Sequence, residues 1–546
     1  MVVRTFEPRY VPPPPRRHRR GWLLGFAAFV ALLVAGLGVL VALWSGATLS
    51  PDGSALAKVG LQPFAGALVR ASAFGPDGTT IPVAIDGGRI TPLEQLTPGE
   101  AISVDVVIRR PGWLSWLLGS FRDERLTLRA PLARVADRWL TVASGEQVAV
   151  SFEQPVTAVS FAAAGQPAVN LRLPAPTRTV ILPGLGGAGS ASVSAAVRSW
   201  EKQSAPVTVS WFPRSRSPVA VADPAPGSEV SPLTPIRLTF SVPVSTLLGG
   251  RPPAVDAAAH GSWRELDSHT LLFTPAGLGE PLGTQLRFTL AHAVALSAAS
   301  GELSPASEEL AWTVPVGSPL RLEQLLAQLG YLPLDWQPSG AAVARSARAQ
   351  AAAAVAPPRG SFAWRYPNTP SQLQALWAPR RREQIVKGAV MAFEHTHGLG
   401  VDGIAGPLVW HALLTDAIAG RRTATPYSYV YVRVKEPQLL TLWSAGHTVL
   451  TSPGNTGIPS RPTAHGTFQV FEHIPVGTMR GTNPDGSHYN DPGIRWISYF
   501  NGGDAVHAFP RGSYGTPQSL GCVELPLAAA AKAWPYMPLG TLVTIE

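Results

Sequence analysis

Residues 515–526 read GTPQSLGCVELP and contain Cys522, the single cysteine of this 546-residue chain. The stretch lies between two alternating apolar runs, residues 506–509 and 540–545, which read as β-strands. Further strand-like runs precede it at residues 427–434, 439–443 and 462–470. The sequence therefore predicts a mainly β C-terminal domain over residues 427–546, with the cysteine in a glycine-flanked loop.

The lone thiol of Cys522 needs a chemical explanation. One cysteine cannot form an intramolecular disulfide, and a zinc cluster of cysteines is excluded. A thiolate can attack a carbonyl carbon, a neighbouring imidazole can take its proton or lower its pKa, and N–H groups near a glycine can hold the oxyanion. His507 lies 15 residues before Cys522, on the preceding strand. Alone, the two residues would favour a structural interpretation, in which a small buried apolar thiol lies beside a satisfied histidine.

Residues 427–546 resemble the catalytic domain of the L,D-transpeptidases, often called the YkuD fold. The hallmark of that family is a histidine followed, after a loop, by Ser-His-Gly-Cys. The matching residues in this chain are His507, Ser519, Gly521, Cys522 and Val523. The segments 462–468 and 540–543 match further family elements. Two residues depart from the pattern, because Leu520 stands in place of the second histidine and Glu524 in place of Arg or Asn.

The resemblance implies that Cys522 is the nucleophile and His507 its general base, with the Ala508 carbonyl orienting the imidazole. It also implies an oxyanion hole made by the N–H groups of Gly521 and Cys522, in a loop shaped by Ser519. Cys522 would attack the peptide bond before the terminal D-alanine of a peptidoglycan tetrapeptide stem, and an acceptor amine would then form a 3→3 cross-link. No metal and no cofactor are required. The alternatives are an L,D-carboxypeptidase and a non-catalytic cell-wall-binding protein.

The sequence indicates the roles of the other polar and aromatic residues of this domain less clearly. Trp496 and Tyr499 precede His507 and either line a groove for the stem peptide or belong to a packed β face. The remaining histidines show no ligand spacing, and we expect His465, His473 and His488 to be solvated or substrate-lining rather than catalytic. An imidazolium beside Cys522 would lower the thiol pKa and make alkylation fast at neutral pH.

Near the N-terminus, residues 21–44 carry no charge and are long enough to cross a bilayer about 30 Å thick as a helix. Arginines precede this stretch and no Lys or Arg follows until Lys58, so the positive-inside rule places residues 1–20 in the cytoplasm as a basic tail. We therefore expect a single-pass anchor in a bacterial cytoplasmic membrane, with the rest exported toward the cell wall. A signal peptide cleaved near Ala47 is the alternative.

Between the anchor and residue 316, short alternating runs broken by Pro and Gly predict β-sandwich modules. We expect a β-rich module at residues 47–143 and two modules at 144–216 and 222–316 that resemble bacterial immunoglobulin-like domains. The last two share a spacing of apolar residues, in which the run from Val148 to Val156 matches that from Ile236 to Val244. Trp113, Trp116, Leu117 and Leu118 form an apolar cluster that either touches the membrane or, as we favour, lies in a buried strand or turn.

Residues 320–415 resemble the peptidoglycan-binding type 1 domain, a small three-helix module that docks on cell-wall glycan or stem peptide. Leucines at helical spacing from Leu322 to Leu329, followed by Gly330, predict its first helix. His-Gly-Leu at residues 397–399, Asp-Gly-Ile at 402–404 and Gly-Pro at 406–407 match its second half. An Ala, Pro and Arg-rich stretch at 340–360 is expected to be a flexible insertion. His395 and His397 are expected to be capping or surface residues.

The composition excludes other classes of protein. Glycine and proline number 53 and 54, and charged residues make up 14% of the chain, which suits turn-rich β modules and excludes a coiled coil. The formal net charge is +9, of which residues 1–20 contribute +5. The rest of the chain therefore has no basic surface suited to nucleic acid, and we expect no nucleic-acid partner.

Overall fold

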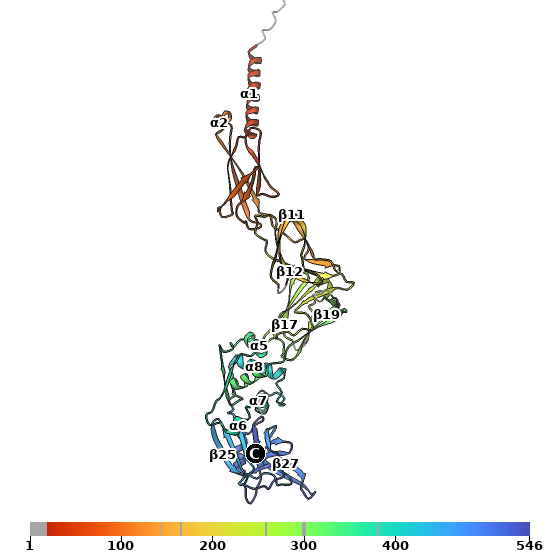
Figure 1. The fold of residues 1–546 in the computed structure, drawn as a ribbon, viewed down its shortest axis with the longest axis vertical. Helices are drawn as coiled ribbons and strands as arrows, with labels where there is room; N and C mark the ends of the chain where they lie inside the picture. Colours follow the sequence, from red (N-terminus) through yellow and green to blue (C-terminus); the bar gives the residue numbers. More distant parts are fainter. Residues whose placement is uncertain (1–18, 144, 164–165, 257–258, 298–301, 379–381) are drawn as a thin grey trace, which may run out of the picture. The chain divides into compact units, whose positions relative to one another are not determined.

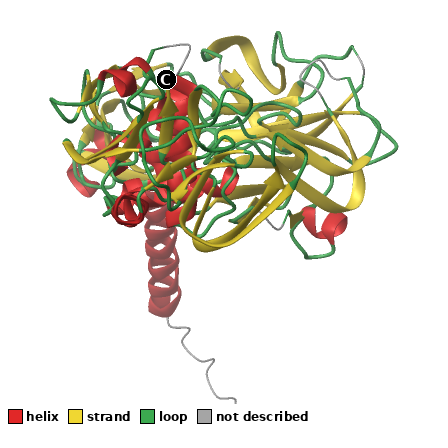
Figure 2. Cartoon of the chain, turned by 90° about the horizontal axis from the view of Figure 1, so that it is seen from below, coloured by secondary structure: helices red, strands yellow, loops and turns green. Residues whose placement is uncertain are grey.

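A computed structural model describes residues 19–143, 145–163, 166–256, 259–297, 302–378 and 382–546. The expected cytoplasmic tail, residues 1–20, lies outside the described residues except for its last two. Strands and loops dominate these residues, as the colouring of Figure 2 shows. The chain divides into two compact units, residues 1–214 with 299–302, and residues 215–298 with 303–546.

The first helix of unit 1, α1 (Arg19–Leu43), includes most of the expected membrane span. Its segment Leu24–Leu43 is long and apolar enough to cross a membrane, and none of this segment is buried against the protein. An all-round apolar surface of this kind is typical of membrane-spanning helices. A signal sequence near an N-terminus meets the same criteria of length and composition.

Two four-stranded antiparallel sheets follow α1 and enclose one core. The strands of the first sheet are, in spatial order, β1 (Ala47–Pro51), β2 (Ala57–Leu61), β6 (Arg89–Pro92) and β5 (Val83–Asp86). The strands of the second are β4 (Thr80–Ile81), β3 (Leu68–Phe74), β7 (Ala101–Arg109) and β8 (Phe121–Arg129). Strand β7 shows why the sheets pack, since Ile102, Val104, Val106 and Ile108 are all buried and alternate with more exposed positions.

The hairpin of β7 and β8 ends in a short helix, α2 (Gly112–Leu118). Leu114 is buried, whereas Trp113, Trp116 and Leu117 are exposed. The expectation that this apolar cluster is a buried strand or turn is therefore wrong. The reason is that the cluster lies at the tip of a long hairpin, beyond the reach of the sandwich core.

A second sheet system completes unit 1. Its described strands are, in spatial order, β11 (Val169–Ile181), β10 (Ala149–Ala163), β12 (Gly189–Ala196), β13 (Val207–Pro213) and β9 (Trp139–Val142). Because β9 pairs with β13, this sheet extends across the boundary expected at residue 144.

Unit 2 starts with another β module, in which β20 (Ser307–Thr313) pairs with β19. The remaining described strands are, in spatial order, β16 (Ala254–Val255), β19 (Gln285–Leu296), β14 (Val219–Asp223), β15 (Ile236–Phe240), β18 (Thr270–Pro275) and β17 (Gly261–Asp267). Pro243 and Val244 begin a short helix, α3 (Val244–Leu248), whereas Pro155 and Val156 lie inside the continuous strand β10. The spacing shared by the two segments therefore does not reflect a shared local structure.

The helical module of unit 2 is larger than expected. Its described residues form five helices, α4 (Pro319–Leu329), α5 (Ala347–Val355), α6 (Ser371–Ala375), α7 (Arg382–Thr396) and α8 (Pro407–Ala419). The stretch expected to be a flexible insertion contains α5, which is flanked by a hairpin of β21 (Leu334–Pro338) and β22 (Gly360–Trp364). The Ser346 hydroxyl accepts from Ala349 N–H and caps α5, whose face of Gln350, Ala351 and Ala354 is buried. The prediction of a flexible insertion is thus wrong.

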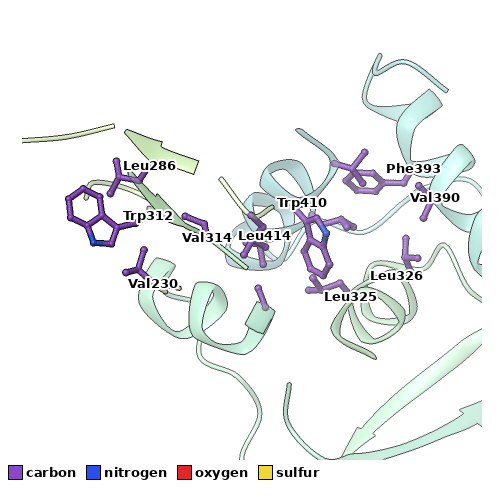
Figure 3. Close-up of a cluster of buried hydrophobic side chains, with 14 of the residues drawn as sticks. Val230, Leu286, Trp312, Val314, Leu325, Leu326, Val390, Phe393, Trp410 and Leu414 are labelled. Atoms are coloured by element: carbon purple, nitrogen blue, oxygen red, sulfur yellow. The ribbon is translucent and has the colours of Figure 1, made fainter. Parts of the chain in front are cut away.

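His397 is a capping residue, one of the two roles expected for it, and also contacts the next helix. Its Nε2 lies 2.8 Å from Asp416 Oδ2 and its Nδ1 lies 2.8 Å from the Phe393 carbonyl oxygen, so it ties the end of α7 to α8. A continuous apolar cluster runs through unit 2, and Figure 3 shows Trp312 and Val314 of the β module near Trp410 and Leu414 of α8. The same cluster includes Tyr429 and Trp443 of the C-terminal domain.

The C-terminal domain contains two sheets. The first is ordered β25 (His447–Pro453), β24 (Leu439–Ser444), β23 (Ser428–Arg433), β31 (Leu542–Ile545) and β26 (Gly466–Gln469). The second is ordered β27 (Glu472–Thr482), β28 (His488–Asn501), β29 (Asp504–Ala508) and β30 (Val523–Leu525). Helix α9 (Leu527–Ala533) and the 3-10 turn η1 (Trp534–Tyr536) contact β28. Figure 1 shows the three consecutive modules of unit 2, from β17 to β27.

Candidate active site

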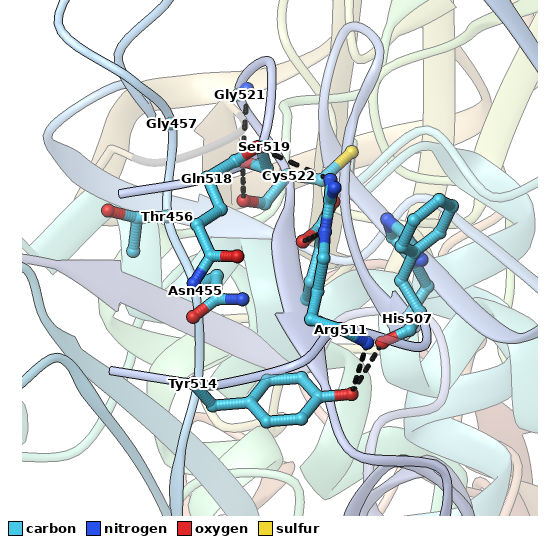
Figure 4. Close-up of polar contacts among 12 residues, drawn as sticks. Asn455, Thr456, Gly457, His507, Arg511, Tyr514, Gln518, Ser519, Gly521 and Cys522 are labelled. Carbon is cyan, nitrogen blue, oxygen red and sulfur yellow. Dashed lines mark hydrogen bonds and ion pairs between the residues drawn. The ribbon is translucent and has the colours of Figure 1, made fainter. Parts of the chain in front are cut away.

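The candidate site lies where β29 and β30 run side by side. The two strands are parallel, with Val506 opposite Val523 and His507 opposite Glu524. Parallel neighbours need a crossover, and residues 509–522 form it. His507 lies within β29 and Cys522 comes directly before β30, so the loop returns the cysteine to the strand beside the histidine (Figure 4).

His507 is held by the backbone. Its side chain is buried, with 2% exposure, and its Nδ1 lies 3.0 Å from the Ala508 carbonyl oxygen. A carbonyl only accepts, so the proton of a neutral ring sits on Nδ1 and the lone pair on Nε2. Burial lowers the pKa of His507, and the Ala508 carbonyl and Glu524 offset part of this effect. The uncharged form of the imidazole is therefore favoured at pH 7.

Cys522 is partly buried, and its thiol lies 3.7 Å from the Gly503 carbonyl oxygen. The side chain packs against the small apolar cluster of Ile494, Ile497 and Ala505. Burial raises the pKa of the thiol to about 12; the Ala505 backbone opposes this effect, whereas Asp504 adds to it. At pH 7 the thiol form of Cys522 is therefore favoured, as is the uncharged imidazole of His507. The expectation that an imidazolium lowers the pKa of Cys522 is wrong.

Ser519 and Gly521 shape the turn before the cysteine. The Ser519 hydroxyl donates to the Cys522 carbonyl oxygen at 2.6 Å and accepts from the Gly521 N–H at 3.3 Å. Gly521 has φ +126°, and a Cβ built there would lie 2.2 Å from Asp504 Oδ1, so this position requires glycine. Because the Gly521 N–H already donates to Ser519, its expected place in the oxyanion hole is not supported.

Glu524, one of the two departures from the family pattern, has an ion-pair partner that the sequence did not reveal. Its carboxylate is buried, with 4% exposure, and accepts from Arg511 Nε at 2.8 Å and Nη2 at 2.7 Å. The same guanidinium lies 4.6 Å from the centre of the Phe509 ring. This bidentate pair ties the crossover loop to β30 directly behind the cysteine.

A second missed residue, Asn455, anchors the crossover loop from a distant segment. Asn455 is fully buried, and its Oδ1 accepts from Gly515 N–H at 2.9 Å while its Nδ2 donates to the Ser513 carbonyl at 3.3 Å. The neighbouring Thr456 carbonyl accepts from the Ser519 N–H at 3.0 Å. These contacts fix the loop that presents the thiol, and Figure 4 shows Asn455 and Thr456 beside Gln518 and Ser519.

The two aromatic residues expected near a groove are separated. Tyr499 belongs to the apolar cluster that contains Cys522, and the thiol raises its pKa, although burial is the larger cause. Trp496 instead packs in the other core of the domain, 5.3 Å from Trp534. Tyr489 on the same strand was missed, and Cys522 likewise raises its pKa after burial. The aromatic residues near the thiol therefore include Tyr489, Tyr499 and Phe509, the last of which packs against the same apolar cluster.

The other histidines of the domain differ in burial and in contacts. His473 is half-buried, stacks on Trp534 at 4.0 Å, and has a pKa lowered to about 4 by burial. His488 is exposed in the hairpin of β27 and β28, where it contacts Thr482. Among the described residues, no group of three or more His, Cys, Asp or Glu side chains is arranged to hold a metal ion.

Comparison with known proteins assigns the C-terminal domain to a family. Residues 427–545 match the L,D-transpeptidase catalytic domain family, YkuD. An L,D-transpeptidase from Mycobacterium smegmatis is 13% identical, with 60% of this chain and 96% of that chain covered and a TM-score of 0.20. The catalytic domain of the Enterococcus faecium L,D-transpeptidase is 23% identical over 23% of this chain and 100% of that chain, with a TM-score of 0.21.

L,D-transpeptidase 3 from Mycobacterium tuberculosis is 11% identical, with 60% of this chain and 97% of that chain covered and a TM-score of 0.21. Such low TM-scores carry no argument, and the assignment rests on the family match. The curated proteins gave no match. Residues 427–545 are an L,D-transpeptidase catalytic domain of the YkuD family.

Proposed function

We propose that this chain is a membrane-anchored, exported L,D-transpeptidase that cross-links peptidoglycan stem peptides through an acyl-enzyme on Cys522. The observation that carries the proposal is the placement of His507 in β29 and of Cys522 directly before the adjacent parallel strand β30, with the histidine proton held on Nδ1 by the Ala508 carbonyl. This placement leaves Nε2 as the basic atom of a buried imidazole, beside the strand that follows the thiol.

The neutral resting pair defines the order of proton transfers. As the sulfur attacks the carbonyl carbon before the terminal D-alanine, the thiol proton passes to His507 Nε2. The Cys522 N–H is the donor we assign to the developing oxyanion. When the tetrahedral intermediate collapses, the C–N bond breaks and the imidazolium returns the proton to the leaving D-alanine amine. The product is a thioester on Cys522.

In the second half-reaction the acceptor amine is the nucleophile and the Cys522 thiol is the leaving group. The amine of an acceptor stem attacks the thioester, His507 takes the amine proton, and the thiol is regenerated with that proton. Attack by a side-chain amine of the third stem residue gives a 3→3 link, and attack by water gives the carboxypeptidase product. Neither half-reaction needs a metal or a cofactor.

The other modules suit this role. We assign residues 320–415 to docking on cell-wall glycan or stem peptide, the β modules to a spacer, and residues 21–44 to the anchor. In this arrangement the N-terminus is cytoplasmic and the catalytic domain faces the cell wall. The uncharged 24-residue stretch, with arginines only on its N-terminal side, supports the anchor and its orientation.

The test is incubation of the purified chain with tetrapeptide muropeptides, followed by mass spectrometry of the products. We expect cross-linked dimers and a transient adduct on Cys522, both absent from the Cys522→Ala variant. Tripeptides without dimers would identify a carboxypeptidase. A folded chain that forms no adduct and no product would exclude an enzyme and leave a wall-binding protein.

A further inference from the structure

The tip of the β7–β8 hairpin, residues 111–121, is apolar in a place where hairpins are normally polar. These residues, called here the aromatic tip, contain no charged side chain, whereas Arg110 precedes them and Arg122 follows. Trp116 is 80% exposed, and Trp113 and Leu117 are each 59% exposed. Contiguous apolar side chains of this size on a protein surface mark a site of contact with a partner or a membrane.

Several backbone carbonyls of the aromatic tip have hydrogen-bond partners within the protein. The Arg110 guanidinium donates to the carbonyl oxygens of Leu118, Gly119 and Phe121, at the C-terminal end of α2. The Ser115 hydroxyl donates to the Gly112 carbonyl at 2.9 Å. In a hydrocarbon environment an unpaired carbonyl costs several kcal/mol, so internal hydrogen bonds of this kind are what a segment in lipid requires.

The aromatic tip is also joined to the end of the apolar helix α1. Arg122 donates to the carbonyl oxygens of Ala42 at 2.7 Å and Leu43 at 3.3 Å, which are among the last carbonyls of α1. Trp44, Phe64 and Trp113 form a row of rings, with centroid separations of 6.4 Å and 6.3 Å. Figure 1 shows α2 beside the C-terminal part of α1. The exposed side chains therefore lie where α1 would leave the bilayer.

We propose that the aromatic tip inserts into the outer leaflet of the bilayer that α1 crosses, as a second membrane contact of unit 1. The inference rests on the proposed anchor, because it places the tip in the same membrane. Lipid is the occupant that the contacts favour, since the tip continues the surface of α1. Trp and Arg side chains at its edge match the composition of a membrane–water interface. Two attachment points would restrict the swing of the domain about residue 44.

The experiment measures depth in the bilayer for single probes on the full-length chain. Cys522→Ser removes the natural thiol, and a single cysteine is then introduced by Trp116→Cys, Leu117→Cys, Leu33→Cys or Leu93→Cys and labelled with a small environment-sensitive fluorophore. The labelled chains are reconstituted in phosphatidylcholine and phosphatidylglycerol vesicles whose acyl chains carry bromine as a contact quencher. All four side chains are exposed, so the substitutions leave the core intact.

The control positions are fixed by the structure. Leu33 lies within α1 and reports whether the span is in the membrane. Leu93 is 70% exposed and follows β6 at the far end of the sandwich, near Leu96, which hydrogen-bonds to Trp200 of the next module. We expect the probes at 33, 116 and 117 to be quenched by brominated lipid and the probe at 93 to be unaffected.

Each other outcome has one meaning. If the probe at Leu33 is not quenched, the anchor itself is refuted, and with it the proposed membrane location. If Leu33 is quenched and both tip probes are not, the inserted tip is refuted while the anchor stands. Tip probes shielded from aqueous iodide but not quenched by lipid would show that a second copy of the chain covers the tip, which also overturns the proposal.

Discussion

Replacing Gly521 by alanine tests whether the turn before Cys522 sets the position of the thiol. Two costs arise at this residue. The backbone has φ +126°, where an L residue is strained by about 1–3 kcal/mol. The added methyl group would also lie 2.2 Å from Asp504 Oδ1, and such overpacking costs about 1–3 kcal/mol. Together they amount to at least about 2 kcal/mol, which the loop relieves by moving.

A displaced loop withdraws the thiol from His507, so the cost appears in the rate of acylation. Because about 1.4 kcal/mol corresponds to a factor of ten, we expect Gly521→Ala to lower the acylation rate roughly 30-fold or more. The rate is measured as single-turnover formation of the acyl-enzyme from a tetrapeptide muropeptide, by intact-protein mass spectrometry. Gly503→Ala is the matched control, since no atom lies within 4 Å of a Cβ built there.

A second variant separates the two costs. Asp504→Gly removes the carboxylate that the new methyl group would meet but leaves the φ strain, so Gly521→Ala with Asp504→Gly should recover about 5- to 10-fold of the lost rate. Wild-type acylation by Gly521→Ala would refute the reasoning about the turn. A double variant as slow as Gly521→Ala alone would refute the clash with Asp504.

Three further predictions concern the same site. His507→Ala should lower the rate of acylation about 10²- to 10⁴-fold, whereas His465→Ala, His473→Ala and His488→Ala should change this rate little. A similar loss of rate in any of the last three variants would contradict the assignment of His507 as the base. A general base acts when it is deprotonated, and burial lowers the pKa of His507. The acid limb of the pH–rate profile should therefore have its midpoint below the ordinary histidine pKa of about 6.5. A midpoint above that value would contradict a buried neutral imidazole. Arg511→Met leaves the Glu524 carboxylate buried without its partner and should destabilise the domain by about 2–3 kcal/mol, a figure reduced because the arginine is partly exposed. The double variant Arg511→Met with Glu524→Leu should recover this stability. Hydrogen exchange of residues 504–525 measures both effects, and equal protection in the wild type and both variants would refute the role of the ion pair.

Local patterns predicted the parts of the chain that depend on local chemistry. The uncharged run before Ser45 predicted an apolar helix, and the leucine spacing ending at Gly330 predicted α4, whose C-terminus has Gly330 at φ +94°. The His507 and Cys522 segments predicted the catalytic family, because these motifs read directly from the sequence. Their roles as base and nucleophile stay predictions.

Long-range contacts explain what the sequence did not reveal. Asn455 lies 60 residues from Gly515, whose N–H it accepts, and nothing in its own segment indicates that partner. Glu524 reads as a substitution for a basic residue until Arg511 is seen across the crossover loop. Helix α5 was missed because its alanine-rich sequence resembles a linker, while its stability comes from packing of one face. The helical module also shares one apolar cluster with both neighbours, which no pattern of domain boundaries indicated.

The burial that raises the pKa of the Cys522 thiol has a consequence for its reactivity. Because the pKa is raised well above 7, the thiol form dominates at neutral pH. Peroxides and disulfides attack the thiolate, so the same burial slows oxidation of this side chain. The nucleophile would form only when a substrate carbonyl is in place to accept it. Burial therefore shields this single cysteine, which has no disulfide partner in the chain.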